Sequence, residues 1–455
     1  MHYMNPFDFV PLPPGGPKAL PKDLLDERRL EGRITYRIQT LTPLHITGRT
    51  TKSGKHFHTQ YFNEAYGRKV IPGASVRGML SAFIEALTGS DMRSFTRGNE
   101  SGRPYAKSRG RHVGFLMASP GDGVEGKTEK DTYTHRGQKK TRPLYERHDT
   151  MPRGFGRRKI EDAARCLFGY VAQEKRDGDE NGAAEIAVGG RLAFEDIPLP
   201  AEMETVFSKA WDLDSDAIMG GPNPRANTAW YFTPGGPRMR STAEGHRVWE
   251  ILADEVRGRK FYFHQRPEPC HAQYAEWKRW MKAMVEYQVE AIPAGATIGG
   301  GRIDFTDLPE SLLTLLAYAV ALEPGMAHKL GGRKPYGFGS VALAIDGLDY
   351  RYMDEPLQPI KPEGLRGRLD TKLLDLGAYK RLKRILHFPQ RGEEGDYLFV
   401  YPPFNPRGKD PEQRGFATVE RAVGDPPKPG NSQKITMYFD HYQKTAVNYK
   451  KVMGG

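Results

Sequence analysis

At 455 residues the chain is long enough for one enlarged domain or for two. Its formal net charge of +12 favours a polyanionic partner, a nucleic acid first and an acidic protein second, because Lys and Arg side chains that neutralise phosphates release condensed counterions. Two cysteines exclude a disulfide framework, and no run of about 18 apolar residues predicts a membrane span, so we expect a cytoplasmic chain without membrane contact.

The N-terminal elements follow from local patterns. Prolines recur through residues 1–32, which predicts an extended N-terminal arm without regular structure. Apolar and polar side chains alternate over residues 33–41, which predicts a strand with one basic, polar face. Ser75 is expected to open an amphipathic helix that ends before Gly89, because apolar residues recur at helical spacing between them.

Two stretches look like insertions into a core. Residues 97–159 hold 16 Lys or Arg against 7 Asp or Glu, so this Gly-rich stretch carries +9 of the net charge. We expect it to be an ordered insertion because it also contains apolar and aromatic residues. Residues 213–245 hold two turn-forming clusters of Gly and Pro and look like a second insertion.

The remaining elements alternate between short helices and strands. We expect helices over residues 160–170 and 307–322, the second with Asp307 and Glu310 in a capping box. Residues 347–455 show no strong pattern apart from a basic helix at 372–386, and we treat them as a C-terminal extension. Strands are expected at residues 190–196, 260–264, 287–292 and 340–345.

The most informative segment is the glycine-rich loop, residues 329–341, with the sequence KLGGRKPYGFGSV. Its glycines allow the backbone to approach a phosphate, Lys329, Arg333 and Lys334 add positive charge, and Tyr336 or Phe338 is suited to stack on a base. The alternative interpretation is a tight turn. A dinucleotide-binding fingerprint does not fit, because the glycines here follow a helix and lead into a strand.

A second candidate site lies at the predicted start of the first long helix. Residues 70–79 place a tight turn before the helix, with Ser75 and Arg77 beside backbone amides that a helix N-terminus leaves free. An anion such as a phosphate fits there. An ordinary capped helix with a surface arginine explains the same residues equally well.

Four sequence blocks occur in the order found in one known family. They are residues 44–48 (LHITG), 71–78 (IPGASVRG), 166–169 (CLFG) with 190–196 (GRLAFED), and the glycine-rich loop. In these blocks the chain resembles the repeat-associated mysterious protein (RAMP) superfamily, and within it the backbone subunits of type III CRISPR effector complexes. Residues 5–12 (NPFDFVPL) are similar to a branch of these subunits that carries long insertions.

The resemblance implies an α+β fold with a ferredoxin-like βαββαβ core, the plan of an RNA-recognition fold. We therefore expect an N-terminal arm at 1–32, a core at 33–346 and an extension at 347–455. It also implies that the chain binds guide RNA, pairs with target RNA through that guide, and assembles with other subunits of the effector. The residues expected to contact RNA are Gly73, Ser75, Arg77, Lys329, Gly331, Gly332, Arg333, Lys334, Tyr336, Gly337, Phe338 and Gly339.

Backbone subunits of this kind often cleave target RNA with an acidic residue between the first strand and the first helix. Here residues 48–70 contain no Asp but hold Lys55, His56 and His58, and a His and Lys pair is able to assist attack of a 2′-hydroxyl on the next phosphate. We weigh simple RNA contact or packing above catalysis. No bound cofactor is expected, with Mg²⁺ needed only if target RNA is cleaved.

Three further hypotheses remain open. His264, Cys270 and His271 are suitable zinc ligands, but their spacing is irregular and a fourth ligand is missing nearby, so we expect no metal site. The chain also fits a guide-maturing endoribonuclease of the same superfamily. A catalytically inactive adaptor that caps an effector or docks another subunit is the third alternative.

Overall fold

The computed structural model describes residues 2–4, 6–53, 57–91, 130–135, 138–143, 161–175, 183–213, 238–241, 247–250, 257–278, 284–353, 355, 358–359, 369–389 and 397–399. None of the helices in these ranges has the length and apolar character needed to span a lipid bilayer.

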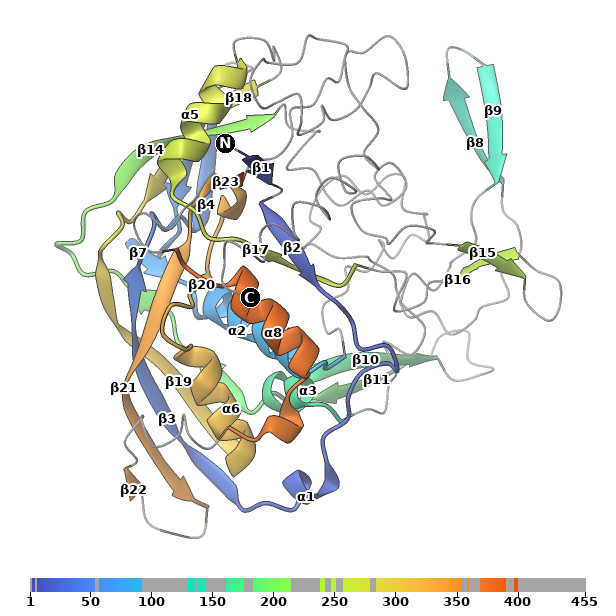
Figure 1. Ribbon diagram of the computed structural model, residues 1–455, viewed down its shortest axis with the longest axis vertical. Coiled ribbons are helices and arrows are strands. Elements are labelled where there is room, and N and C mark those ends of the chain that lie inside the picture. Colours follow the sequence, from blue (N-terminus) through green and yellow to red (C-terminus); the bar gives the residue numbers. More distant parts are fainter. Residues whose placement is uncertain are drawn as a thin grey trace.

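The main sheet is antiparallel and has the strand order β12-β19-β3-β21-β20. Figure 1 labels β19, β3, β21 and β20 on one side of the molecule. Helix α2 follows β3 in the chain, and α6 follows β19, so the elements run βαββαβ. This is the ferredoxin-like plan that the resemblance implied, and the expected α+β class is confirmed. The bounds are β3 (Arg29–Thr40), α2 (Gly73–Leu87), β12 (Leu192–Phe194), β19 (Thr297–Pro309), α6 (Glu310–Val320), β20 (His328–Lys329) and β21 (Ser340–Tyr352), with β22 (Gln358–Pro359) paired to β21.

Alternation along β3 separates the two faces of this sheet. Ile34, Tyr36 and Ile38 are fully buried, whereas Arg33 and Arg37 on the other face are exposed. Helices α2, α6 and α8 (Leu376–Ile385) lie together on the buried face (Figure 1). The hydrophobic core therefore fills the space between the sheet and these three helices.

A second, four-stranded sheet has the order β14-β18-β5-β4. Its strands are β4 (Thr47–Ser53), β5 (Phe57–Phe62), β14 (Val206–Leu213) and β18 (Met284–Ala291). A backbone bridge between Leu44 and Ile292 joins it to the start of the ferredoxin-like core. A small three-stranded sheet has the order β13-β7-β6. Its strands are β6 (Glu64–Ala65), β7 (Arg68–Ile71) and β13 (Ile197–Pro198).

The other described elements are short pairs and turns around this framework. Two-stranded pairs are β1 (His2–Met4) with β23 (Tyr397–Phe399), β2 (Phe7–Val10) with β17 (Arg259–Tyr262), β8 (Lys130–His135) with β9 (Gln138–Pro143), β10 (Tyr170–Lys175) with β11 (Ala183–Val188), and β15 (Arg238–Ser241) with β16 (Arg247–Glu250). The helical pieces are α1 (Lys22–Leu25), α3 (Ala163–Phe168), α5 (Pro267–Lys278), η2 (Lys334–Tyr336) and η3 (Thr371–Leu373).

The N-terminal residues correct one expectation. Strands β1 and β2 form where the prolines predicted no regular structure, and Phe7, Phe9 and Val10 are buried. Asp8 on β2 pairs with Arg381 on α8. Prolines remove local hydrogen bonds but do not prevent a strand between them from pairing with β17.

Two expected helix starts were also wrong. Helix α2 begins at Gly73 with Pro72 at its N-cap, so Ser75 lies inside the first turn. Asp307 has a left-handed backbone (φ 51°) and α6 begins only at Glu310, after Pro309. The first turn of α6 is capped from outside, because Glu27 accepts a hydrogen bond of 2.8 Å from the Ser311 amide.

Candidate nucleic-acid interface

The glycine-rich loop runs from β20 through η2 into β21 and packs against residues 44–48. The Gly332 amide donates to the His45 carbonyl at 2.8 Å, and the Gly339 amide donates to the Pro43 carbonyl at 2.8 Å. The Leu330 amide donates to the Gly339 carbonyl, also at 2.8 Å. These three amides therefore donate to carbonyls of the protein itself and are not free to bind a phosphate.

Two of the glycines are required by this packing. Gly331 (φ +77°) lies so close to the His45 carbonyl that an added Cβ would be 2.2 Å from its oxygen. Gly339 (φ +75°) lies against Leu330, where a Cβ would be 2.0 Å from the carbonyl oxygen. Glycine is needed here because two backbone segments touch in a left-handed conformation. The first and last of the four sequence blocks are thus in direct contact.

The aromatic residues of the loop are not placed to stack on a base. Tyr336 and Phe338 are both fully buried. Gly337 between them packs against Pro267, so the loop presses its rings toward α5. The expectation that Tyr336 or Phe338 meets a base fails because the core captures both rings, as burial of an aromatic ring is strongly favourable.

The three basic residues of the loop differ in environment. Lys329 is 7% exposed and donates to the Phe338 carbonyl at 3.0 Å, and burial lowers its pKa to about 7. Arg333 has a left-handed backbone (φ 55°), is 7% exposed, and donates from Nε to Gln60 at 3.1 Å. Lys334 is half-buried, and burial lowers its pKa as well. Of the three, Lys334 keeps the most access to solvent.

His45 is a buried residue at this junction that the sequence analysis did not select. Its Nδ1 lies 2.7 Å from the Glu290 carbonyl, which assigns the ring proton to Nδ1, and its Nε2 lies 3.1 Å from the Thr47 hydroxyl. Burial lowers its pKa to about 4, so the imidazole is neutral near pH 7. The signal in the sequence was a lone His inside the apolar block at residues 44–48.

Glu290 links the second sheet to the strands beside α2. Its carboxylate accepts hydrogen bonds from Lys69, from the Thr205 hydroxyl at 2.6 Å and from the Phe62 amide at 2.9 Å. Burial acts to raise its pKa, but the donors from Lys69, Thr205 and Phe62 outweigh burial and the pKa is lowered. Glu290 therefore remains a carboxylate that ties three strands together.

The start of α2 already holds an anion from the protein itself. The Gly73 amide donates to Asp196 Oδ1 at 2.8 Å, and a Cβ at Gly73 would lie 2.6 Å from the Phe194 carbonyl oxygen. Arg77 donates from Nη2 to the Phe168 carbonyl at 2.5 Å. These contacts join two of the four blocks, residues 71–78 and residues 166–169 with 190–196, and the expected phosphate position at this helix N-terminus is taken by a carboxylate.

The candidate catalytic residues are only partly placed. Lys55 and His56 lie outside the described residues. His58 lies on β5, opposite Lys52 on β4 and Tyr287 on β18, and its side chain is 8% exposed. A side chain this buried has little access to RNA, which favours the packing interpretation for His58.

Two of the three candidate zinc ligands, His264 and Cys270, contact other groups of the protein. His264 lies 2.9 Å from the Ser340 hydroxyl and 3.0 Å from the Ala327 carbonyl, and both contacts use ring nitrogens. Cys270 Sγ faces the carbonyls of Pro335 and Phe399 at 3.9 Å. Within the part of the chain that the structure describes, no group of three or more His, Cys, Asp or Glu side chains is arranged to hold a metal ion.

The open face of the ferredoxin-like sheet carries paired charges. Arg33 pairs with Asp304 at 2.7 Å, Arg302 pairs with Glu195 at 3.2 Å, and Arg37 and Arg351 pair with Asp346 and Glu31. An RNA-recognition fold binds bases with aromatic rings on this face. Here the corresponding surface is a ladder of ion pairs.

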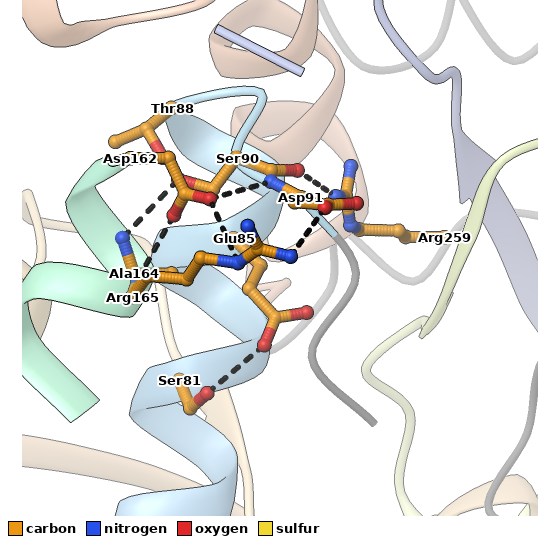
Figure 2. Close-up of polar contacts among 9 residues, drawn as sticks. All are labelled: Ser81, Glu85, Thr88, Ser90, Asp91, Asp162, Ala164, Arg165 and Arg259. Carbon is orange, nitrogen blue, oxygen red and sulfur yellow. Dashed lines mark hydrogen bonds and ion pairs between the residues drawn. The ribbon is translucent and has the colours of Figure 1, made fainter. Parts of the chain in front are cut away.

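A buried polar cluster joins residues that come before the basic residues 97–159 to residues that come after them (Figure 2). Arg165 donates to Asp91 Oδ2 at 2.6 Å, and the Asp91 amide donates to Asp162 Oδ2 at 3.2 Å. Asp162 also caps α3 by accepting from the Arg165 amide at 2.9 Å, and Arg259 donates to the Ser90 carbonyl. The cluster therefore holds Asp91 close to Asp162 and Arg165, which follow it in the chain by about 70 positions.

Comparison with known proteins identifies a family. A family model described as the RAMP superfamily matches residues 37–342, which run from β3 to the start of β21. No curated protein matches the chain. Among solved structures, Csc2 of Thermofilum pendens is 13% identical with a TM-score of 0.31, covering 82% of this chain and 90% of that one. A chain of a Type IV-B CRISPR complex is 15% identical with a TM-score of 0.28, covering 69% and 90%.

Proposed function

This chain belongs to the RAMP superfamily, and from that membership we propose that it is a guide-RNA-binding backbone subunit of a type III CRISPR effector that recognises target RNA. The observation that carries the proposal is that the family match runs from within β3 to the start of β21 and so includes every element of the ferredoxin-like core between these two strands. In such a complex, base pairing between guide and target reads the sequence, and the protein contacts mainly the backbone of the guide.

The distribution of charge supports an RNA partner. Residues 97–159 carry +9 of the net charge of +12, and Asp91 before this segment is held against Asp162 and Arg165 after it. A basic insertion anchored at one point fits the role of a thumb that engages the guide. Lys334 adds a cation at the glycine-rich loop.

The test is to recover the RNA that the chain binds in cells. The tagged chain would be purified from cells that express a type III CRISPR array and its effector subunits, and the bound RNA would be sequenced. We expect RNAs of defined length that join repeat-derived and spacer-derived sequence. A variant with Arg153, Arg157, Arg158 and Lys159 changed to Gln should retain less of this RNA at raised salt, because fewer phosphates are neutralised.

Two outcomes would contradict the proposal and select one of the alternatives. If the tagged chain is purified together with the other subunits, and neither the chain nor the whole complex carries guide RNA, the chain is a structural adaptor. Cleavage of hairpin repeat RNA by the isolated chain would identify a guide-maturing endoribonuclease.

A further inference from the structure

Three side chains from distant parts of the sequence meet on the second sheet. Arg49 on β4 places its guanidinium carbon 4.7 Å from the centroid of the Tyr61 ring on β5. The Tyr61 ring meets Phe207 on β14 edge to face, with ring centroids 5.9 Å apart and planes at 90°. The sheet therefore carries a row of one cation and two aromatic rings.

This row is accessible to solvent. Phe207 is 47% exposed and its neighbour Val206 is 43% exposed, while Arg49 is also exposed. A single exposed apolar side chain is ordinary on a protein surface. Here the exposed Phe207 ring packs against Tyr61, and Arg49 lies over the Tyr61 ring. This arrangement is more specific, because nucleobases stack on ring faces and phosphates bind cations.

The charge of Arg49 is available, in contrast to the arginines of the ferredoxin-like sheet. Arg33 and Arg37 each form an ion pair, with Asp304 and with Asp346. Among the described residues, no carboxylate lies within salt-bridge distance of Arg49, and its contact is with the Tyr61 ring. A phosphate that approaches the second sheet would therefore meet the unpaired positive charge of Arg49. On the ferredoxin-like sheet it would meet arginines whose charge is already balanced by carboxylates.

We propose that Arg49, Tyr61 and Phe207 form a stacking platform for single-stranded RNA, with a base on the exposed ring of Phe207 and a phosphate at Arg49. The platform rests on the proposed function and adds to it the place and the chemistry of one RNA contact. Recognition there is independent of base identity, since every base presents a flat π face. This platform takes the role that the buried Tyr336 and Phe338 do not fill.

The test compares two labelled strands that differ only in their bases. Fluorescence anisotropy would measure binding of the full-length chain to an oligoadenylate of about 12 nucleotides and to an abasic strand of equal length and charge. The wild-type chain should prefer the strand with bases. Phe207→Leu should bind oligoadenylate about tenfold more weakly and lose that preference, whereas Phe207→Trp should keep it. Arg49→Gln should weaken both strands and reduce the slope of log Kd against log salt by about 0.7.

Matched controls come from the same chain. Leu376→Ala removes an apolar side chain that is 56% exposed on α8, and Arg37→Gln removes an arginine that is already paired. Neither should change the preference for bases. Because the three platform residues lie at the surface, circular dichroism should show folded variants.

The outcomes separate the platform from the function on which it rests. Equal binding of oligoadenylate by wild type and Phe207→Leu would overturn the platform while leaving the proposed function intact. Failure of the wild-type chain to bind either strand, alone and within the effector, would overturn the proposed function. Binding of an acidic protein lost in Phe207→Leu, with RNA binding unchanged, would reassign the surface to a protein partner.

Discussion

Arg165 donates a 2.6 Å hydrogen bond to Asp91, and this buried ion pair joins a residue that precedes the basic residues 97–159 to one that follows them. Removing one member of a buried pair leaves an uncompensated charge. We expect Arg165→Leu to lower the free energy of unfolding by about 3 kcal/mol in denaturant titrations. Arg33→Leu, which removes an exposed pair with Asp304, should cost about 1 kcal/mol or less. Equal losses in the two variants would show that the cluster is not a buried anchor.

The buried histidines predict a loss of stability in mild acid. Burial lowers the pKa of His45, His271 and His328 to about 4, and lowers that of His264 well below its usual value. The unfolded chain takes up protons near pH 6.5 that the folded chain does not, so stability is complete above about pH 6.5 and falls as the pH drops toward about 4. His45, His271 and His328 each contribute about 3 kcal/mol to this loss once the pH is below about 4.

His328→Gln tests this prediction with one side chain. His328 Nε2 lies 2.7 Å from the Ala319 carbonyl, and Gln retains a donor for that contact. Urea unfolding between about pH 6.5 and 4.5 should show a shallower loss of stability for the variant, by about one proton. A pH dependence identical to that of the wild type would contradict the assignment.

Lys329 and Lys334 belong to the same loop but should behave differently. Lys329 is buried with a pKa lowered to about 7, so Lys329→Met should leave RNA affinity unchanged and should not weaken the fold near neutral pH. Between about pH 7 and about pH 10 the folded Lys329 is neutral while the unfolded lysine still holds a proton, so wild-type stability should rise with pH over this range. Lys329→Met should lack this rise. Lys334→Ala should reduce the salt slope of RNA binding by about 0.7. If Lys329→Met lost RNA affinity and Lys334→Ala did not, Lys329 rather than Lys334 would be the residue that contacts RNA.

Cleavage of target RNA is tested at the histidines of residues 48–70. In the reconstituted effector with guide RNA and Mg²⁺, we expect every cut to remain in a double variant with His56→Ala and His58→Ala, because His58 is only 8% exposed. A Lys55→Ala variant tests the third candidate catalytic residue in the same assay, and every cut should remain there too. Disappearance of one set of cuts, with assembly and target binding intact, would show instead that this chain is a ribonuclease.

Several elements were predictable because their signals are local. The alternation over residues 33–41 became β3, the helical spacing between Ser75 and Gly89 became α2, and the basic helix at 372–386 became α8. The expected strands at 190–196 and 340–345 became β12 and β21. In each case one repeating pattern of apolar residues specifies which face is buried. The division of the chain into an arm, a core and an extension stays a prediction.

The sequence by itself determined the helical and strand periods of the core and the concentration of positive charge in residues 97–159, and its resemblance to the RAMP superfamily implied the ferredoxin-like class. Only the tertiary structure decided which side chains reach solvent. The Gly73 amide finds Asp196 across 123 positions, and the rings of Tyr336 and Phe338 turn inward while Phe207 stays exposed. Local patterns cannot specify such contacts, because the partner that satisfies a polar group or buries a ring is supplied by a distant segment of the chain.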